Sequence, residues 1–101
     1  MIELPSIIRG RDSSYWMYGI VVDKLSYGMS RDELREALRR RGIDTRDFFY
    51  PPDQQPVLKE SKRFLNATYL SRNGLYLPSG LGNTDEELRE VVRTIKSLYK
   101  N

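Results

Sequence analysis

The segment "SYWMYGIVV", Ser14–Val22, decides how this sequence folds. It is rich in aromatic and β-branched residues, which favour a strand. Side chains alternate between the two faces of a strand, and here both faces are apolar. Such a strand lies either in the middle of a covered sheet or against a partner surface. Gly19 marks a bulge or a close approach of another group to the backbone.

The next well-defined segment is "SRDELREALRRRG", which carries the signals of a helix over residues 30–42. Ser30 is an N-cap residue, and Glu33 stands three positions later, which completes a capping box. Leu34 and Leu38 belong to a narrow apolar stripe at helical spacing. Gly42 ends the helix as the residue that adopts a left-handed conformation.

The segment "TDEELREVVRTIKSLYK", residues 84–100, predicts a longer helix near the end of the chain. Thr84 and Glu87 form a second capping box. Acidic residues follow the N-cap, and lysines stand in the last turn, which suits the helix dipole. One continuous apolar stripe runs along it and comprises Leu88, Val91, Val92, Ile95, Leu98 and Tyr99.

The remaining elements are shorter. We expect strands over 43–49 and 75–78, a short helix within 63–74 that Gly74 caps, and loops over 23–29 and 57–62. The resulting order, β-α-β-loop-α-β-α, predicts an α/β (α+β) fold with a small three-stranded sheet covered by helices. The pairing order does not follow from the sequence, although short connections favour a mixed or antiparallel sheet. Residues 1–13 are expected to be irregular, and residues 14–101 to form one domain.

Composition limits the chemistry that this chain can perform. Its 101 residues suit one domain, 31% of them are charged, and it contains no cysteine and no histidine. We therefore expect no disulfide, no thiol chemistry and no metal site. We find no membrane span and no signal peptide, so a cytoplasmic location is the default expectation. Catalysis would need other groups, such as the lysines at positions 24, 59, 62, 96 and 100.

The most unusual stretch is "TRDFFYPPDQQP", residues 45–56, in which three aromatic residues precede two prolines. Pro51 and Pro52 exclude a helix, because they lack a backbone N–H group and fix φ. They also stiffen the segment, so that neighbouring aromatic and amide groups are held in place at low entropic cost. The stretch contains too many aromatic residues to be an ordinary solvent-exposed loop.

These segments, in this order and spacing, resemble the C-terminal small domain of the DegT/StrS-type sugar aminotransferases. The specific blocks are "GIDTRDFFYP", residues 42–51, and "GLYLPSG", residues 74–80. The likeness extends from about residue 13 to residue 99 and is greatest to the perosamine-synthetase-like branch. The resemblance implies the small domain of a fold-type I aminotransferase.

The resemblance also implies a function and its missing parts. Enzymes of this family use pyridoxal phosphate to pass an amino group from glutamate to the C4 keto group of a nucleotide-linked 4-keto-6-deoxy sugar, as in lipopolysaccharide, O-antigen or other amino-sugar biosynthesis. Their Schiff-base lysine and phosphate-binding groups belong to a large N-terminal domain whose motifs do not occur here. We therefore expect a fragment that has no catalytic residue, binds no cofactor and is inactive alone. Its partners would be that large domain and the nucleotide-sugar substrate.

By the same resemblance, the loop after the second strand borders the substrate cleft. Arg46 would meet a diphosphate or a carboxylate, Tyr50 would offer a ring face and a hydroxyl, and Asp53 and Gln55 would contact sugar hydroxyls. The family often has a histidine where this chain has Asp53, and an acid there would repel phosphate.

Structural and non-catalytic interpretations stay open beside this one. Arg46 could instead form an ion pair with Asp44 or Asp47, and the phenylalanines of the loop could serve packing alone. A freestanding binding or oligomerisation module would use its exposed apolar surface to self-associate. A nucleic-acid binder rests on the mild net charge of +3 and the cluster Arg39–Arg41; because that cluster suits a helix C-terminus, we expect neither nucleic-acid nor membrane binding.

Overall fold

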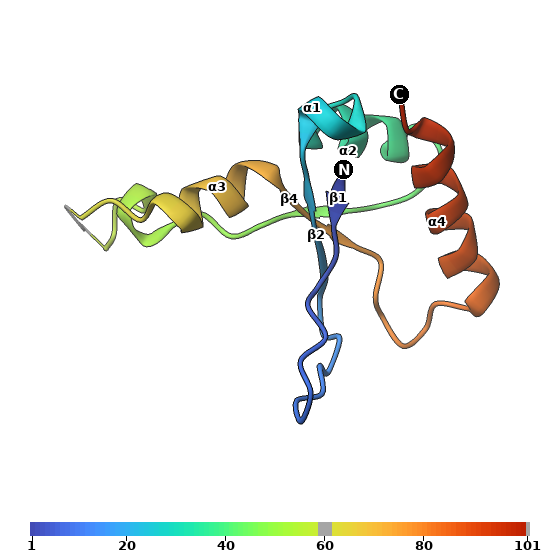
Figure 1. Cartoon of the computed structure of the whole chain (residues 1–101), viewed down its shortest axis with the longest axis horizontal. Helices are drawn as coiled ribbons and strands as arrows, with labels where there is room; N and C mark the ends of the chain where they lie inside the picture. Colours follow the sequence, from blue (N-terminus) through green and yellow to red (C-terminus); the bar gives the residue numbers. More distant parts are fainter. Residues whose placement is uncertain (59–61, 101) are drawn as a thin grey trace.

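The computed structural model describes residues 1–58 and 62–100. Its centre is an antiparallel pair of strands, β2 (Tyr18–Val22) and β4 (Gly74–Leu77). The two-residue strands β1 (Ile2–Glu3) and β3 (Arg46–Asp47) flank this pair. The order is β1-β2-β4-β3, and every neighbouring pair is antiparallel (Figure 1). The second half of the segment that decides the fold is therefore a central strand, whereas residues 14–17, which we expected to belong to it, lie outside the strand.

The sheet has four strands, so the expected three-stranded sheet is wrong in number. The additional strand, β1, lies within the segment that we expected to be irregular and pairs with Val21 and Val22. A two-residue strand is too short to show the alternation by which strands are recognised. The strand expected over 43–49 is likewise reduced to Arg46–Asp47.

Helices cover one face of the sheet and form the core with it. Directly paired residues of antiparallel strands point to the same face, so Ile20 and Leu75 share a face. Helix α2 (Arg31–Arg39) and helix α4 (Asp85–Leu98) pack against that face (Figure 1). The completely buried side chains are those of Ile20, Val22, Leu34, Leu38 and Leu75. The core thus lies between the central strands and α2.

Both long helices begin as their sequences predict. Ser30 and Glu33 form a reciprocal capping box at α2, and Thr84 and Glu87 form another at α4. Helix α2 ends in a Schellman motif, because the N–H of Ile43 donates to the carbonyl of Leu38 and Gly42 has a φ of 75°.

Two elements differ from the sequence expectation or refine it. Residues 24–27, expected as a loop, form the short helix α1 (Lys24–Tyr27), because the carboxylate of Asp23 accepts hydrogen bonds from the N–H groups of its first turn. Helix α3 (Leu65–Asn73) ends at Gly74, which also begins β4. Helix α3 extends outward from the sheet, on the left in Figure 1, and α4 lies on the other side.

The described part of the chain, residues 1–58 and 62–100, offers neither a membrane-spanning helix nor a metal cluster. None of its helices combines the length and the apolar character that crossing a bilayer requires. The same residues contain no cluster of three or more acidic side chains arranged to hold a metal ion.

Candidate functional site

The proline-containing loop is held in one conformation by its own hydrogen bonds. Pro52–Gln54 form a short 3-10 helix, and the side-chain amide of Gln55 donates to the backbone carbonyl of Tyr50 at 2.7 Å. Tyr50 itself is 72% exposed. The loop therefore presents the Tyr50 ring to solvent on a closed, stiff support.

Asp53 is the unusual polar group of this loop. Its Oδ1 atom is buried and has no hydrogen-bond partner among the described residues. A buried carboxylate oxygen without a partner is unfavourable, and in native structures such an atom calls for a donor. The neighbouring Gln54 side chain donates to Thr68 Oγ1 at 3.2 Å, which ties the loop to α3.

The base of the loop is fixed by the ring of Phe48. That ring stacks on Tyr76 with a centroid separation of 4.4 Å and lies against Gly19 and Gly74. A Cβ atom at Gly19 would stand 2.7 Å from the Phe48 ring, so a larger residue could not be accommodated without movement. The close backbone approach anticipated at Gly19 is confirmed, and Phe48 is a packing residue.

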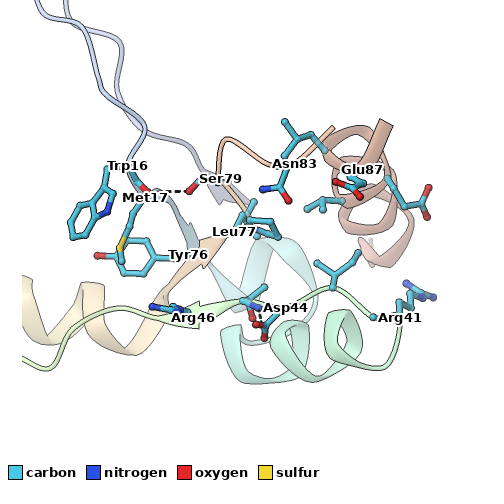
Figure 2. A pocket seen from close by; sticks show the side chains of 18 residues that line it. Trp16, Met17, Arg41, Asp44, Arg46, Tyr76, Leu77, Ser79, Asn83 and Glu87 are labelled. Carbon is cyan, nitrogen blue, oxygen red and sulfur yellow. Dashed lines mark hydrogen bonds between the residues drawn. The ribbon is translucent and has the colours of Figure 1, made fainter. Parts of the chain in front are cut away.

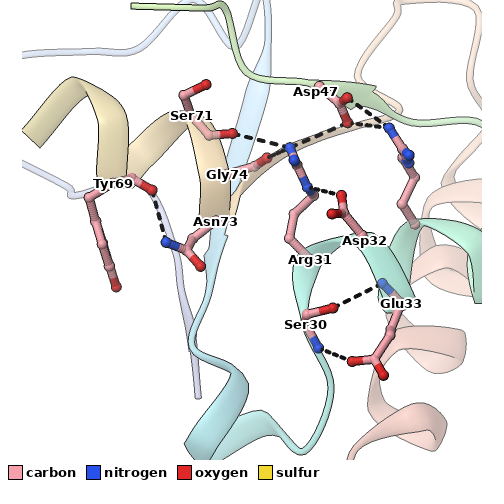
Figure 3. Close-up of polar contacts among 10 residues, drawn as sticks. Ser30, Arg31, Asp32, Glu33, Asp47, Tyr69, Ser71, Asn73 and Gly74 are labelled. Carbon is pink, nitrogen blue, oxygen red and sulfur yellow. Dashed lines mark hydrogen bonds and ion pairs between the residues drawn. The ribbon is translucent and has the colours of Figure 1, made fainter.

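A second anchor is polar and joins four elements (Figure 3). Arg31, whose side chain is 12% exposed, donates to the carbonyls of Ser71 at 3.2 Å and Gly74 at 3.1 Å. Asp47 lies 3.3 Å from Arg31 and accepts two hydrogen bonds from Arg35 at 2.7 and 2.8 Å. These contacts hold β3, from which the loop leaves. Sequence reasoning missed them, because the partners are distant in the chain and carry no pattern.

Arg46 lies apart from Tyr50, Asp53 and Gln55. It lines a polar groove of about 740 Å³ between the end of α2, β3 and the turn before α4, and the other three residues do not (Figure 2). The expected ion pair with Asp44 or Asp47 is wrong, because Asp47 is engaged by two other arginines, and Arg46 has no ion pair among the described residues.

The polar groove combines aromatic and charged side chains from distant segments. Its lining includes Trp16, Arg46, Tyr76, Ser79, Asn83 and Glu87. The Ser79 hydroxyl donates to the backbone carbonyl of Trp16 at 3.2 Å, so it holds the turn against the strand (Figure 2). The predicted site residues are thus divided between this groove and the loop.

The basic cluster at the end of α2 is partly paired within the chain. Arg39 and Arg40 both bind the Glu36 carboxylate, at 2.8 and 3.1 Å. The hydrogen bond from Arg39 has the largest effect and that from Arg40 the next, and they lower the pKa of Glu36 from 4.5 to about 2. Because the Glu36 carboxylate occupies Arg39 and Arg40, these two arginines are less available to bind a phosphate.

The model of the DegT/DnrJ/EryC1/StrS aminotransferase family matches residues 2–96. This chain belongs to that family. Over 93 residues it is 32% identical to GDP-perosamine synthase of Vibrio cholerae. The aligned residues make up 89% of this chain and 25% of that protein.

Solved structures of family members have the same fold. DesV of S. venezuelae superposes with a TM-score of 0.84 at 23% identity, covering 99% of this chain and 27% of DesV. An aminotransferase from Brucella abortus superposes with a TM-score of 0.83 at 18% identity, covering 99% of this chain and 26% of that protein. The chain thus spans about a quarter of the length of its relatives and matches their C-terminal part.

The family depends on pyridoxal phosphate, which such enzymes bind through a reactive lysine. A lysine that forms a Schiff base is activated by removal from water or by a neighbouring cation. Lys24, Lys96 and Lys100 are exposed, and Lys59 lies outside the described residues. Lys62 is exposed as well, so none of the described lysines is removed from water.

Proposed function

We propose that this chain acts as the C-terminal domain of a nucleotide-sugar aminotransferase, in which it forms one wall of the substrate cleft and supplies no catalytic group. The observation that carries the proposal is the match of nearly the whole chain to a quarter of a sugar-nucleotide enzyme. The reaction would be transamination at C4 of a nucleotide-linked 4-keto-6-deoxy sugar, with perosamine formation as the nearest model. The reactive half of the enzyme would be the large N-terminal domain.

The loop geometry supports the assignment of Tyr50, Asp53 and Gln55 to the substrate wall. Tyr50 is exposed on a stiff support, and Asp53 has a buried oxygen that accepts no hydrogen bond from the described residues. A sugar hydroxyl is a suitable donor to the Asp53 carboxylate, and it would reach the buried oxygen once the side chain turns toward the cleft. Gln55 acts mainly by holding the Tyr50 carbonyl, so its contribution is to position the ring. Arg46, in the polar groove, would serve the anionic part of the substrate.

The test is a chimera in which this chain replaces the C-terminal quarter of the Vibrio cholerae GDP-perosamine synthase. We expect the chimera to turn over its sugar nucleotide. Tyr50→Phe and Asp53→Ala should each raise KM about tenfold with little change in kcat, since each removes one hydrogen bond to bound substrate. Tyr69→Phe is the matched control, because Tyr69 is a partly exposed tyrosine on α3. An active chimera whose KM is unmoved by both loop variants would contradict the assignment.

The predicted inactivity of the isolated chain is tested separately. The 101-residue protein is mixed with pyridoxal phosphate, reduced with borohydride and analysed by mass spectrometry. We expect no stoichiometric attachment to any lysine. Stoichiometric attachment at one site would show that the chain contains its own reactive amine, and Lys96, which borders an apolar surface, is the first position to inspect.

A further inference from the structure

A second groove, which we call the apolar groove, has no role in the function described above. It has a volume of about 1080 Å³ and lies between β2 and α4. Its lining includes Leu4, Tyr15, Tyr18, Leu88, Val92 and Tyr99. Among the described residues that line it, Lys96 has the only charged side chain. The polar groove, in contrast, is lined by two arginines and three acids.

The apolar groove exists because α4 uses only part of its stripe against the core. Val91 is buried, whereas Leu88, Val92 and Tyr99 are 38%, 49% and 48% exposed. On the sheet side, Tyr15 is also exposed, and its ring stacks on Tyr18 at 6.0 Å. A contiguous apolar surface of this kind is characteristic of an interface rather than of a solvent-facing helix.

The length of the relatives and the position of residue 1 indicate what covers the groove. In the relatives, about three quarters of the polypeptide lies outside the matched part, which is C-terminal. In the present structure, Met1, Ile2 and Leu4 line the apolar groove, and the Met1 amino group contacts the Ser26 hydroxyl. Polypeptide that precedes residue 1 in a protein of the relatives' length would therefore leave the domain beside this groove. A short connection brings such a segment to the groove at little entropic cost.

We propose that the apolar groove is the docking surface for an apolar segment of the N-terminal part of the aminotransferase. The proposal rests on the proposed function, and it identifies where the two parts of the enzyme meet. The segment presents aliphatic or aromatic side chains to Leu88 and Val92. The tyrosines at the rim offer ring faces to it and keep their hydroxyls available for hydrogen bonds. The docking surface is therefore separate from the substrate loop.

Cysteine labelling tests this surface directly, because the chain contains no cysteine of its own. Val92→Cys places one thiol in the apolar groove. Ser97→Cys is the matched control, because Ser97 is exposed on the same helix, does not line the groove and differs from cysteine by one atom. Each variant is made in the 101-residue chain and in the chimera, and the rate of reaction with N-ethylmaleimide is followed by mass spectrometry of the peptide.

We expect Val92→Cys to react at least about tenfold more slowly in the chimera than in the isolated chain, since docking must open before the thiol reacts. Ser97→Cys should change less than about twofold. Equal rates for Val92→Cys in an active chimera would overturn the docking proposal and leave the proposed function intact. Protection of Val92→Cys in a chimera without turnover would support docking and contradict the proposed function.

Two further outcomes are decisive. If the isolated chain protects Val92→Cys increasingly as its concentration rises, a second copy of the chain occupies the groove, and the proposal is overturned. If the chimera does not fold, cysteines at the two aligned positions of the intact Vibrio cholerae synthase are labelled instead. Slow reaction only at the position aligned with Val92 supports the proposal. Equal reaction at that position and at the one aligned with Ser97 overturns it.

Discussion

Helices α2 and α4 begin in the same way and end in different surroundings. Each has a complete capping box, acidic residues in its first turn and an apolar stripe. The two leucines of α2, Leu34 and Leu38, are completely buried. The stripe of α4 is divided, with Val91 inside the core and Val92 half-exposed. Local sequence signals thus specify that a helix forms. How much of its apolar stripe is buried depends on how many other elements pack against the helix.

The difference indicates that α2 stabilises this domain and that α4 serves two surfaces. Burial removes apolar area from water, and the free energy gained scales with that area. Side chains that stay exposed in the isolated chain contribute little to its folding and remain available to a partner. Substitutions in the two helices separate these two roles.

The largest effect is expected at the buried stripe of α2. Leu38→Ala should lower the free energy of unfolding by about 3 kcal/mol, since it removes a buried side chain and leaves a cavity. Urea denaturation followed by circular dichroism measures the change. A loss below about 1 kcal/mol would mean that α2 is not the main support of the sheet.

Two adjacent valines test the divided stripe of α4. Val91→Ala should lower the free energy of unfolding by about 2 kcal/mol, because Val91 is buried. Val92→Ala should change it by less than about 0.5 kcal/mol in the isolated chain, since alanine is the better helix former and little area is lost. Equal losses for the two variants would show that the apolar groove is closed in solution.

The two capping boxes offer a balanced comparison. Ser30→Ala and Thr84→Ala should each lower the free energy of unfolding by about 1 kcal/mol, because each leaves helix N–H groups without an acceptor. Thermal denaturation measures both. A negligible effect at Thr84 alone would indicate that α4 is not firmly part of the cooperative unit.

The smallest effect is a pH dependence on the exposed side of α2. The pKa of Glu36 is lowered from 4.5 to about 2 by its hydrogen bonds from Arg39 and Arg40. Its contribution to stability is therefore present above the unfolded pKa and is lost as pH falls through the folded value. Glu36→Gln should make the decrease of Tm between about pH 5 and pH 2 shallower. The double variant Arg39→Gln/Arg40→Gln should reproduce that slope, and an unchanged slope would contradict this cause.

Much of the framework could be predicted from the sequence, because its signals are local. The capping boxes lie within four residues of each other, and Gly42 ends α2 as its position indicated. The central strand was recognisable because it is apolar on both faces. The family was recognisable from the blocks around Arg46 and Tyr76, which the match to residues 2–96 confirms.

The remainder depends on contacts between distant segments. Strand β1 has two residues and is defined by its pairing with β2. The Arg31 network joins residues about forty positions apart, and no regular spacing in the sequence predicts it. The separation of Arg46 from the loop follows from the direction in which the chain leaves β3. The apolar groove requires the positions of β2 and α4 together.

The arrangement of Phe48 against Gly19 and Gly74 has a consequence for how this family can vary. The three positions share one fixed volume, which the phenylalanine ring fills and the two glycines leave free. A methyl group added at Gly19 would need a smaller side chain at position 48, whereas one added at Gly74 would also meet the backbone carbonyl of Leu70. Substitution at Gly19 is therefore tolerated only together with a change at Phe48, so a glycine outside the proline-containing loop helps to fix where that loop begins.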